Sequence, residues 1–240
     1  MERKRFLKSL SMFALAAPLT TQSCAKEEST DAVDGGKEVV ADGSCVVSPS
    51  ETEGPFPTKN PASYVRSDIR KGDGVGANMN AKITVVNANN NCAALEGAVV
   101  DVWHCDVNGD YSEYGGTQMQ STNYQSVHWF RGRQVTDSNG LVTFQTIFPG
   151  WYQGRATHIH VHIYNSAGRS LLVTQIAFQD SLSTTVNTTG SAYGYTKGMS
   201  RYTYNAYDSV FSDSVAKEMS TVTGSLAAGF EMSITIRVSV

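Results

Sequence analysis

Short runs of β-branched and aromatic residues alternate with polar, turn-forming residues along most of the chain after about residue 81. Runs of this length, in which apolar residues tend to fall at every second position, are typical of β-strands. The segments between them are rich in Asn, Asp and Gly, which tight turns require. The pattern predicts one helix, over residues 209–218, and strands over residues 82–86, 98–103, 141–147, 157–164, 171–178 and 233–240.

Many short strands at regular spacing predict an all-β domain, built as an antiparallel β-sandwich or barrel with long loops. The chain has 240 residues, of which 40% are hydrophobic and 17% are charged. This composition supports a core of ordinary size and argues against a disordered chain. We assign the domain to residues 45–240, because residues 25–44 are small, polar and charged, as in a flexible tether.

Residues 1–24 have the pattern of an export signal. A basic start, Met-Glu-Arg-Lys-Arg-Phe-Leu-Lys, precedes an apolar stretch much shorter than the ~20 residues of a membrane-spanning helix. Cys24 lies where a lipoprotein carries its lipidated cysteine. We therefore expect an exported protein, periplasmic or at the cell surface, whose only membrane contact is a lipid anchor at Cys24. A twin-arginine signal, or a cytosolic protein with a basic N-terminus, are the alternatives.

Charge and cysteine content narrow the function classes. The net charge is −3 and no basic stripe is present, which argues against a nucleic-acid partner held through its phosphates. Outside the cytosol two of Cys45, Cys92 and Cys105 can form a disulfide, and all three pairings are open. None of these cysteines lies in a Cys-x-x-Cys pair, which argues against a thiolate zinc site. The oligomeric state stays open.

The densest chemical signal is the sequence Arg-Ala-Thr-His-Ile-His-Val-His-Ile-Tyr of residues 155–164. On a strand, His158, His160 and His162 lie on one face and the intervening apolar residues lie on the other. Two such imidazoles, about 7 Å apart at their Cα atoms, can bind one metal ion, and imidazoles suit zinc, copper, iron and nickel alike. The alternative is a polar strand surface that faces solvent.

Further motifs occur in a fixed order around this strand. They are Thr-Glu-Gly-Pro-Phe at 52–56, Trp-His-Cys-Asp-Val-Asn-Gly-Asp-Tyr-Ser at 103–112, Phe-Arg-Gly at 130–132, Thr-Ile-Phe-Pro-Gly-Trp-Tyr-Gln-Gly-Arg at 146–155 and Thr-Gln-Ile at 174–176. Together with the histidine strand, this series resembles the intradiol ring-cleavage dioxygenases over most of residues 45–180. The resemblance implies a prealbumin-like β-sandwich and a non-haem ferric ion, Fe(III), held by two tyrosinates and two histidines.

Carried over position by position, the resemblance makes Tyr111 and Tyr152 the phenolate ligands of the iron. His158 and His160 become its imidazole ligands. A phenol has a pKa of about 10 and ionises at neutral pH only beside a strong Lewis acid, and two hard phenolates favour ferric over ferrous iron. In this family the position of Tyr152 is both a ligand and the base that takes up a substrate proton.

The resemblance also implies a substrate site. Arg155 is the fixed cation beside the substrate, and Gln175 is a polar partner behind the ligand set. Pro55 and Phe56 line the pocket mouth. The implied reaction cleaves a catechol-type aromatic diol between its two hydroxylated carbons with O2 and gives a muconate-type diacid. Only two residues separate Tyr152 from Arg155, where the well-studied members have a longer loop, which predicts a more open pocket.

Three further features have structural interpretations. We assign His162 to a structural or supporting role and His104 to a packed position. Residues 106–110 resemble the start of a calcium loop, but Tyr111 takes the glycine position and Thr117 the glutamate position, so we reject that assignment. Two other functions remain as alternatives: a non-catalytic surface β-sandwich that binds a ligand, and a zinc or copper site on the histidine strand.

Overall fold

The computed structural model describes residues 45–240. The predicted export signal, the tether and Cys24 lie outside the described residues. Within residues 45–240, no helix combines the length and the apolar character needed to cross a membrane.

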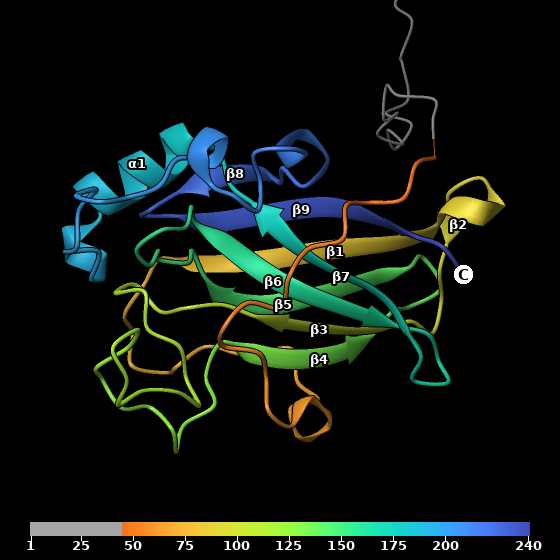
Figure 1. The fold of residues 1–240 in the computed structure, drawn as a ribbon, viewed down its shortest axis with the longest axis horizontal. Helices are drawn as coiled ribbons and strands as arrows, with labels where there is room; N and C mark the ends of the chain where they lie inside the picture. The colour runs from red at the N-terminus through yellow and green to blue at the C-terminus, as the bar shows by residue number, and fades with distance from the viewer. Residues whose placement is uncertain (1–44) are drawn as a thin grey trace, which may run out of the picture. The chain divides into compact units, whose positions relative to one another are not determined.

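The strands form two sheets, which confirms the predicted all-β sandwich (Figure 1). In the first sheet, β1 pairs antiparallel with β5 and β2 and parallel with β9, which in turn pairs with β8. All the other strand pairs of the two sheets are antiparallel. The strands of the first sheet are β1 (Asn78–Asn87), β2 (Ala93–Ala94), β5 (Leu141–Ile147), β8 (Thr221–Ser225) and β9 (Gly229–Val238).

The second sheet carries the histidine strand. Its order is β4-β3-β6-β7, so that the histidine strand β6 is an inner strand with a neighbour on each side. The strands of this sheet are β3 (Val99–Trp103), β4 (Arg131–Val135), β6 (His158–Tyr164) and β7 (Ser170–Ala177).

The hydrophobic core fixes the orientation of β6. Ile159, Val161 and Ile163 belong to the main buried cluster and are at most 2% exposed. Because side chains alternate along a strand, His158 and His160 point to the opposite, outer face of the second sheet. A shift of one residue in the pairing of β6 would move the three apolar side chains out of the core, so their burial also holds the histidines in place.

All six predicted strands are present, and three strands escaped the sequence analysis. The missed strands β2 and β8 are short and mostly exposed, and β4 has the sequence Arg-Gly-Arg-Gln-Val. Each is an edge strand of its sheet, with a neighbouring strand on one side alone. Hydrophobic alternation is weak in such strands, which is why the pattern did not identify them.

The predicted helix over residues 209–218 is wrong. This segment contains turns and one 3₁₀ turn, Val215–Lys217. Backbone bonds such as Ser212 N–H to the Asp208 carbonyl close single turns there, but they do not continue into an α-helix. The α-helix of the described residues is instead α1 (Asp180–Thr189). Its sequence is rich in Ser and Thr and shows little apolar periodicity. The hydroxyls of three threonines bind carbonyls one turn earlier: Thr185, Thr188 and Thr189.

The structure settles the cysteine pairing. Cys45 and Cys92 form a disulfide, and Cys105 is a free, buried thiol. The disulfide ties the first described residue of the domain to the connection between β1 and β2. A cross-link across 47 residues restricts the unfolded chain and so favours the folded state.

Short 3₁₀ turns complete the connections between strands. They are Pro61–Ser63, Ala88–Asn90, Ser191–Tyr193, Asn205–Tyr207 and Val215–Lys217. The segment of residues 137–140, one of those rich in Asn, Asp and Gly, forms a turn in which the Asp137 carboxylate accepts from the backbone N–H groups of Asn139 and Leu141. Asx turns of this kind confirm the assignment of Asn- and Asp-rich segments to loops.

A buried arginine on β4 joins two long loops to the second sheet. The guanidinium of Arg131 is fully buried and donates to the Phe56 carbonyl at 3.0 Å and to Thr58 Oγ1 at 3.1 Å. It also donates to the Ser112 carbonyl at 2.6 Å and to the Ser112 hydroxyl at 2.9 Å. The Glu113 carboxylate lies 3.5 Å from its Nε and supplies the opposite charge. One side chain thus holds residues 56–58 against residues 112–113.

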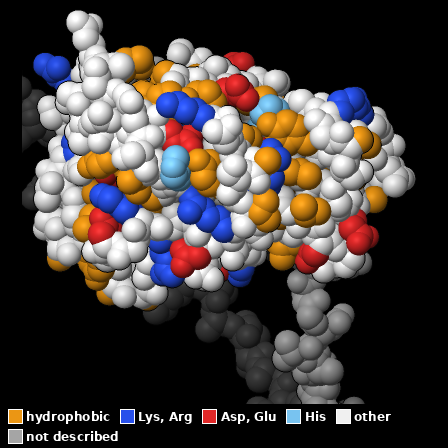
Figure 2. All heavy atoms as spheres, turned by 90° about the horizontal axis from the view of Figure 1, so that it is seen from below, with side chains coloured by type: hydrophobic (Ala, Val, Ile, Leu, Met, Phe, Trp, Pro, Cys, Tyr) orange, Lys and Arg blue, Asp and Glu red, His pale blue; other side chains and the backbone are white. Residues whose placement is uncertain are grey.

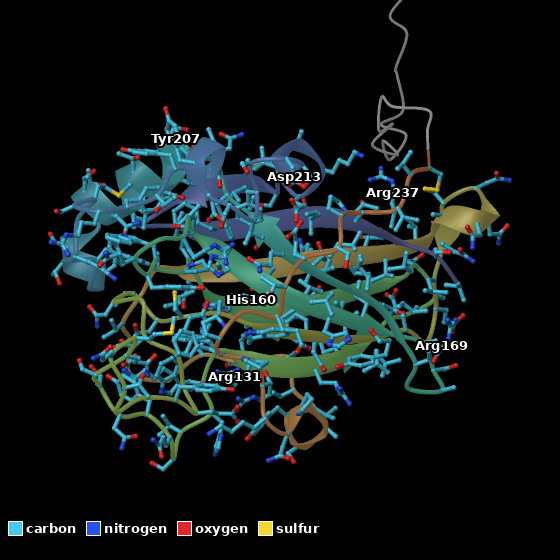
Figure 3. All side chains as sticks on the ribbon, viewed as in Figure 1. Arg131, His160, Arg169, Tyr207, Asp213 and Arg237 are labelled. Atoms are coloured by element: carbon cyan, nitrogen blue, oxygen red, sulfur yellow. A yellow bond between two sulfur atoms is a disulfide. The ribbon has the colours of Figure 1, made fainter. Side chains whose placement is uncertain are left out.

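We expect Arg131→Met to lower the free energy of unfolding by about 3–5 kcal/mol, because it leaves a buried carboxylate and buried carbonyls without their donor. Urea unfolding followed by circular dichroism measures the change. Arg169→Met is the matched control, since Arg169 is exposed on the β6–β7 hairpin (Figure 3) and its loss should change the stability by less than about 0.5 kcal/mol. Equal small effects of the two substitutions would contradict the role given to Arg131.

Candidate active site

The strand registers place four side chains in one row across the outer face of the second sheet. Trp103 on β3 lies opposite both Arg131 on β4 and His160 on β6. His160 lies opposite Gln175 on β7. Directly opposed residues of antiparallel strands share a face, so the row runs from Arg131 through His160 to Gln175. Figure 3 shows His160 near the middle of this sheet.

Three polar atoms converge beside this row. Tyr111 Oη is 3.3 Å from the Nε2 atoms of both His158 and His160, and the two Nε2 atoms are 3.0 Å apart. The ring of Tyr152 lies edge-on to those of Tyr111 and His158, with centroid distances of 5.8 and 5.5 Å. The structure therefore brings together the four residues that the resemblance assigned as ligands.

Both histidines turn their Nε2 atoms toward this point, and that of His158 is unprotonated. Nδ1 of His158 lies 2.7 Å from the Ala156 carbonyl and donates to it, which leaves the Nε2 lone pair free. Burial, with the nearby Arg155 cation, holds the pKa of His158 well below its ordinary value, and burial does the same for His160. Two neutral imidazoles with facing Nε2 atoms are suited to a shared cation.

Aromatic packing supports His160 where hydrogen bonding does not. Within residues 45–240 its Nδ1 has no hydrogen-bond partner. Its ring instead stacks on Trp103 with a centroid distance of 4.9 Å and an interplanar angle of 2°. On another side, a Cβ placed on Gly54 would lie 3.1 Å from the His160 Cε1 atom. Trp103 and the backbone of Gly54 thus hold the His160 ring in place, although its Nδ1 makes no hydrogen bond.

The two tyrosines differ in their surroundings. Tyr111 is fully buried, and burial raises the pKa of its phenol well above the ordinary value. Tyr152 is half-buried; burial raises its pKa too, but the adjacent Arg155 opposes the rise. Both phenols stay protonated at neutral pH unless a strong cation lies beside them.

The donor set fits a hard, trivalent metal ion. Separations of 3.0 and 3.3 Å between donor atoms are those of ligands that each lie about 2.1 Å from one ion at roughly right angles. Within residues 45–240 no group of three or more His, Cys, Asp or Glu side chains forms a metal site. Tyr111 and Tyr152 are the side chains that could complete a ligand set with the two histidines, and phenolate oxygens are hard donors that suit ferric iron.

Arg155 is held by a carboxylate that the sequence analysis did not identify. Its Nε lies 2.9 Å from both oxygens of Asp208, which also accepts from the Ala156 N–H at 2.7 Å. Its Nη2 donates to Gln175 at 2.6 Å, and Gln175 donates in turn to the Thr52 carbonyl at 2.8 Å. Gln175 thus links Arg155 to the segment that carries Gly54.

The two predicted pocket residues lie beside the tyrosines. Phe56 is buried and stacks on Tyr111 with a centroid distance of 4.7 Å, and it meets Tyr152 edge-on at 6.0 Å. Pro55 is exposed. Both line a cavity of about 540 Å³, which supports their assignment to the pocket mouth.

The other histidines lie outside the converging atoms. His162 bonds to Glu53 at 2.9 Å and to Ser170 at 2.8 Å. His104 is buried, stacks on Phe130, and bonds to Thr146 at 2.6 Å. His104 has the packed position that we predicted, and the structural or supporting role of His162 stays a prediction. The rejected calcium loop is an Asx turn, in which the Asp106 carboxylate accepts backbone N–H groups.

Three residues that contact the site residues were given no role in the sequence analysis. Asp208 lies 53 residues from Arg155 along the chain, and Trp103 and Gly54 contact His160 from separate segments. Trp103 and Gly54 occur within quoted motifs, so the motifs did mark them. Asp208 follows a Tyr-rich stretch with no recognisable pattern, and only the fold brings it to Arg155.

Comparisons with known proteins agree with this geometry. The family model described as Dioxygenase matches residues 52–192, which is more than half of the chain. No curated protein gives a significant match in sequence.

Solved structures are also similar. An intradiol ring-cleavage dioxygenase from Tetranychus urticae has a TM-score of 0.71 and 31% identity, and the match covers 81% of this chain and 95% of that one. The dioxygenase domain of a carbohydrate-binding fusion protein from Streptomyces sp. SirexAA-E has a TM-score of 0.58 and 25% identity, with 81% and 99% covered. The 3-chlorocatechol 1,2-dioxygenase of Rhodococcus opacus 1CP shares the fold, with a TM-score of 0.55, 21% identity, and 80% and 72% covered.

The family match extends from the Gly54 segment through all four converging residues to helix α1, and the Tetranychus structure covers most of the described domain. The chain belongs to the intradiol ring-cleavage dioxygenase family.

Proposed function

We propose that this chain is a non-haem Fe(III) dioxygenase that cleaves a catechol-type aromatic diol between its hydroxylated carbons with O2, giving a muconate-type diacid. The convergence of Tyr111 Oη with the Nε2 atoms of His158 and His160 carries the proposal. Tyr152 completes the ligand set. Ferric iron, when bound by these residues, supplies the Lewis acidity that makes the phenols and the diol acidic and activates the diol ring toward O2.

The side chains around the ligand set have separate roles in the proposed reaction. Tyr152 is the half-buried member of the set, so its phenolate is the base that can accept a diol proton at Oη. Arg155, fixed by Asp208 and Gln175, presents a cation that stabilises negative charge on the diol ring. Phe56, packed on both tyrosines, excludes water from one side of the site. The buried Tyr111 stays in place throughout.

We propose further that the protein works outside the cytosol, exported by its N-terminal signal and lipid-anchored at Cys24. The Cys45–Cys92 disulfide supports this location, since such bonds persist in oxidising compartments. Radiolabelled palmitate incorporation that disappears in Cys24→Ala tests the anchor.

Colour and iron content test the ligand set directly. We expect the aerobically purified protein to contain about one iron per chain and to be coloured, because a phenolate bound to ferric iron absorbs visible light. It should consume O2 with catechols. Tyr152→Phe and His160→Ala should lower kcat/KM by more than about 100-fold, since each removes a ligand. A colourless protein without iron, or variants with unchanged rates, would contradict the proposal.

The contact between Gly54 and His160 gives a second test. Gly54→Ala should reduce the fraction of iron retained after dialysis against a chelator by about tenfold, because the added Cβ displaces the His160 ring. Gly74→Ala is the matched control: Gly74 also has a positive φ, of 74° against 67° for Gly54, but nothing lies within 4 Å of the added Cβ. Both variants carry backbone strain, so equal iron loss in the two would show that strain alone is responsible.

The Asp208 carboxylate gives a third test, of Arg155 positioning. Asp208→Asn removes the charge that orients the Arg155 guanidinium, and we expect kcat to fall by about tenfold while iron content is unchanged. Steady-state kinetics and metal analysis measure the two effects. Asp213→Asn, an exposed carboxylate a few residues further on (Figure 3), is the control and should leave kcat unaltered. Loss of iron in Asp208→Asn would instead give Asp208 a role in forming the metal site.

A further inference from the structure

A cavity next to the candidate active site is larger than a catechol ring requires. It has a volume of about 540 Å³ and is lined by residues 55–59 and by the loop of residues 113–125. Both segments lie on the lower side of the sheets in Figure 1, which is the face seen in Figure 2. On that face, basic side chains lie next to exposed hydrophobic ones.

The cavity adjoins the ligand cluster through two aromatic rings. Phe56 lines it and also stacks on Tyr111. Tyr114, another lining residue, meets Phe56 edge-on at a centroid distance of 5.2 Å. Tyr114 and Tyr152 are the two half-buried members of an otherwise buried cluster, and Tyr114 is the one that also lines the cavity.

The cavity contains one positive charge that no carboxylate neutralises. The carboxylate among the lining residues, Glu113, already accepts hydrogen bonds from the Lys59 backbone N–H and the Tyr64 hydroxyl, and it also contacts His128 and Arg131. The Lys59 ammonium lies 4.8 Å from the centre of the Tyr114 ring, and within residues 45–240 it has no ion-pair partner. The hydrogen bond from the Lys59 backbone N–H to Glu113 holds the Lys59 backbone in place at the edge of the cavity.

The apolar and basic side chains that line the cavity indicate which kind of ligand it could bind. Phe56, Tyr114 and Met119 provide apolar surface, and the Lys59 ammonium over the Tyr114 ring provides an anion-binding group. Lys59 contacts Tyr114, Tyr114 contacts Phe56 and Phe56 contacts Tyr111, so two aromatic rings link Lys59 to the ligand cluster. A carboxylate on an unsaturated arm of several bonds matches this series of contacts better than one attached directly to the diol ring.

We propose that Lys59 and Tyr114 form a specificity subsite for substrates in which an extended arm carries a carboxylate away from the diol ring. This inference rests on the proposed dioxygenase function and adds a substrate class to it. Lys59 binds the carboxylate, while Tyr114 and Phe56 pack against the arm.

Paired substrates that differ in charge test the subsite. The wild-type protein should prefer 3,4-dihydroxycinnamate over its methyl ester by about fivefold in kcat/KM, which is the effect of one partly exposed ion pair. Lys59→Gln should abolish this preference, and Lys59→Arg should restore it. Neither should alter the ratio for 3,4-dihydroxybenzoate and its methyl ester, because that carboxylate is too short to reach.

Lys71→Gln is the matched control. Lys71 also lies over aromatic rings, those of Tyr124 and Trp129, but it pairs with Asp73 and does not line this cavity. Its substitution should leave every substrate ratio unchanged. An identical acid-to-ester ratio in the wild type and in Lys59→Gln, with diols still cleaved, would overturn the subsite and leave the proposed function intact.

A binding measurement separates the subsite from catalysis. The monophenol 4-hydroxycinnamate lacks the second hydroxyl and cannot be cleaved, so calorimetry reports its affinity directly. We expect Lys59→Gln to weaken its binding about fivefold and to leave the binding of its methyl ester unchanged. If no diol is cleaved but this difference is present, the subsite stands and the proposed reaction fails; if the difference is absent, the subsite is wrong.

Discussion

The register between β3 and β6 is the constraint on which the site depends. It sets Trp103 opposite His160, and the neighbouring pairs extend the row to Arg131 and Gln175. The free energy that fixes this register comes from the other face of β6, where apolar side chains are buried in the sandwich core. Buried imidazoles are costly by themselves. The hydrophobic core therefore stabilises a polar row that could not hold its own position.

Two buried arginines attach the loops to that row. Arg131 joins residues 56–58 to residues 112–113, and Arg155 joins Asp208 to Gln175 on β7. Each guanidinium has a carboxylate from another segment close by, and each makes several charge-assisted hydrogen bonds. Buried ion pairs contribute little net stability, but losing one partner is costly, so the loops have few alternative positions.

Much of this arrangement followed from the sequence, and the rest did not for physical reasons. Alternation along residues 158–164 predicted both the core face and the histidine face, because period two is a local property. The motifs predicted the tyrosines, Arg155 and Gln175 through a resemblance. Asp208 could not be predicted, since its contact with Arg155 spans 53 residues and depends on a loop path. Helix α1 was missed because its Ser- and Thr-rich sequence has low helical propensity, which tertiary packing overrides.

Burial also distinguishes the two tyrosines of the proposed ligand set. Tyr111 is fully buried, stacks on Phe56, and lies within hydrogen-bonding distance of both imidazoles. Tyr152 is half-buried in the loop between β5 and β6, and Arg155 favours its ionised form. A base must exchange its proton with substrate or solvent, which the more accessible phenol does more readily. In the proposed reaction that difference in burial is the physical reason to give the role of base to Tyr152 and not to Tyr111.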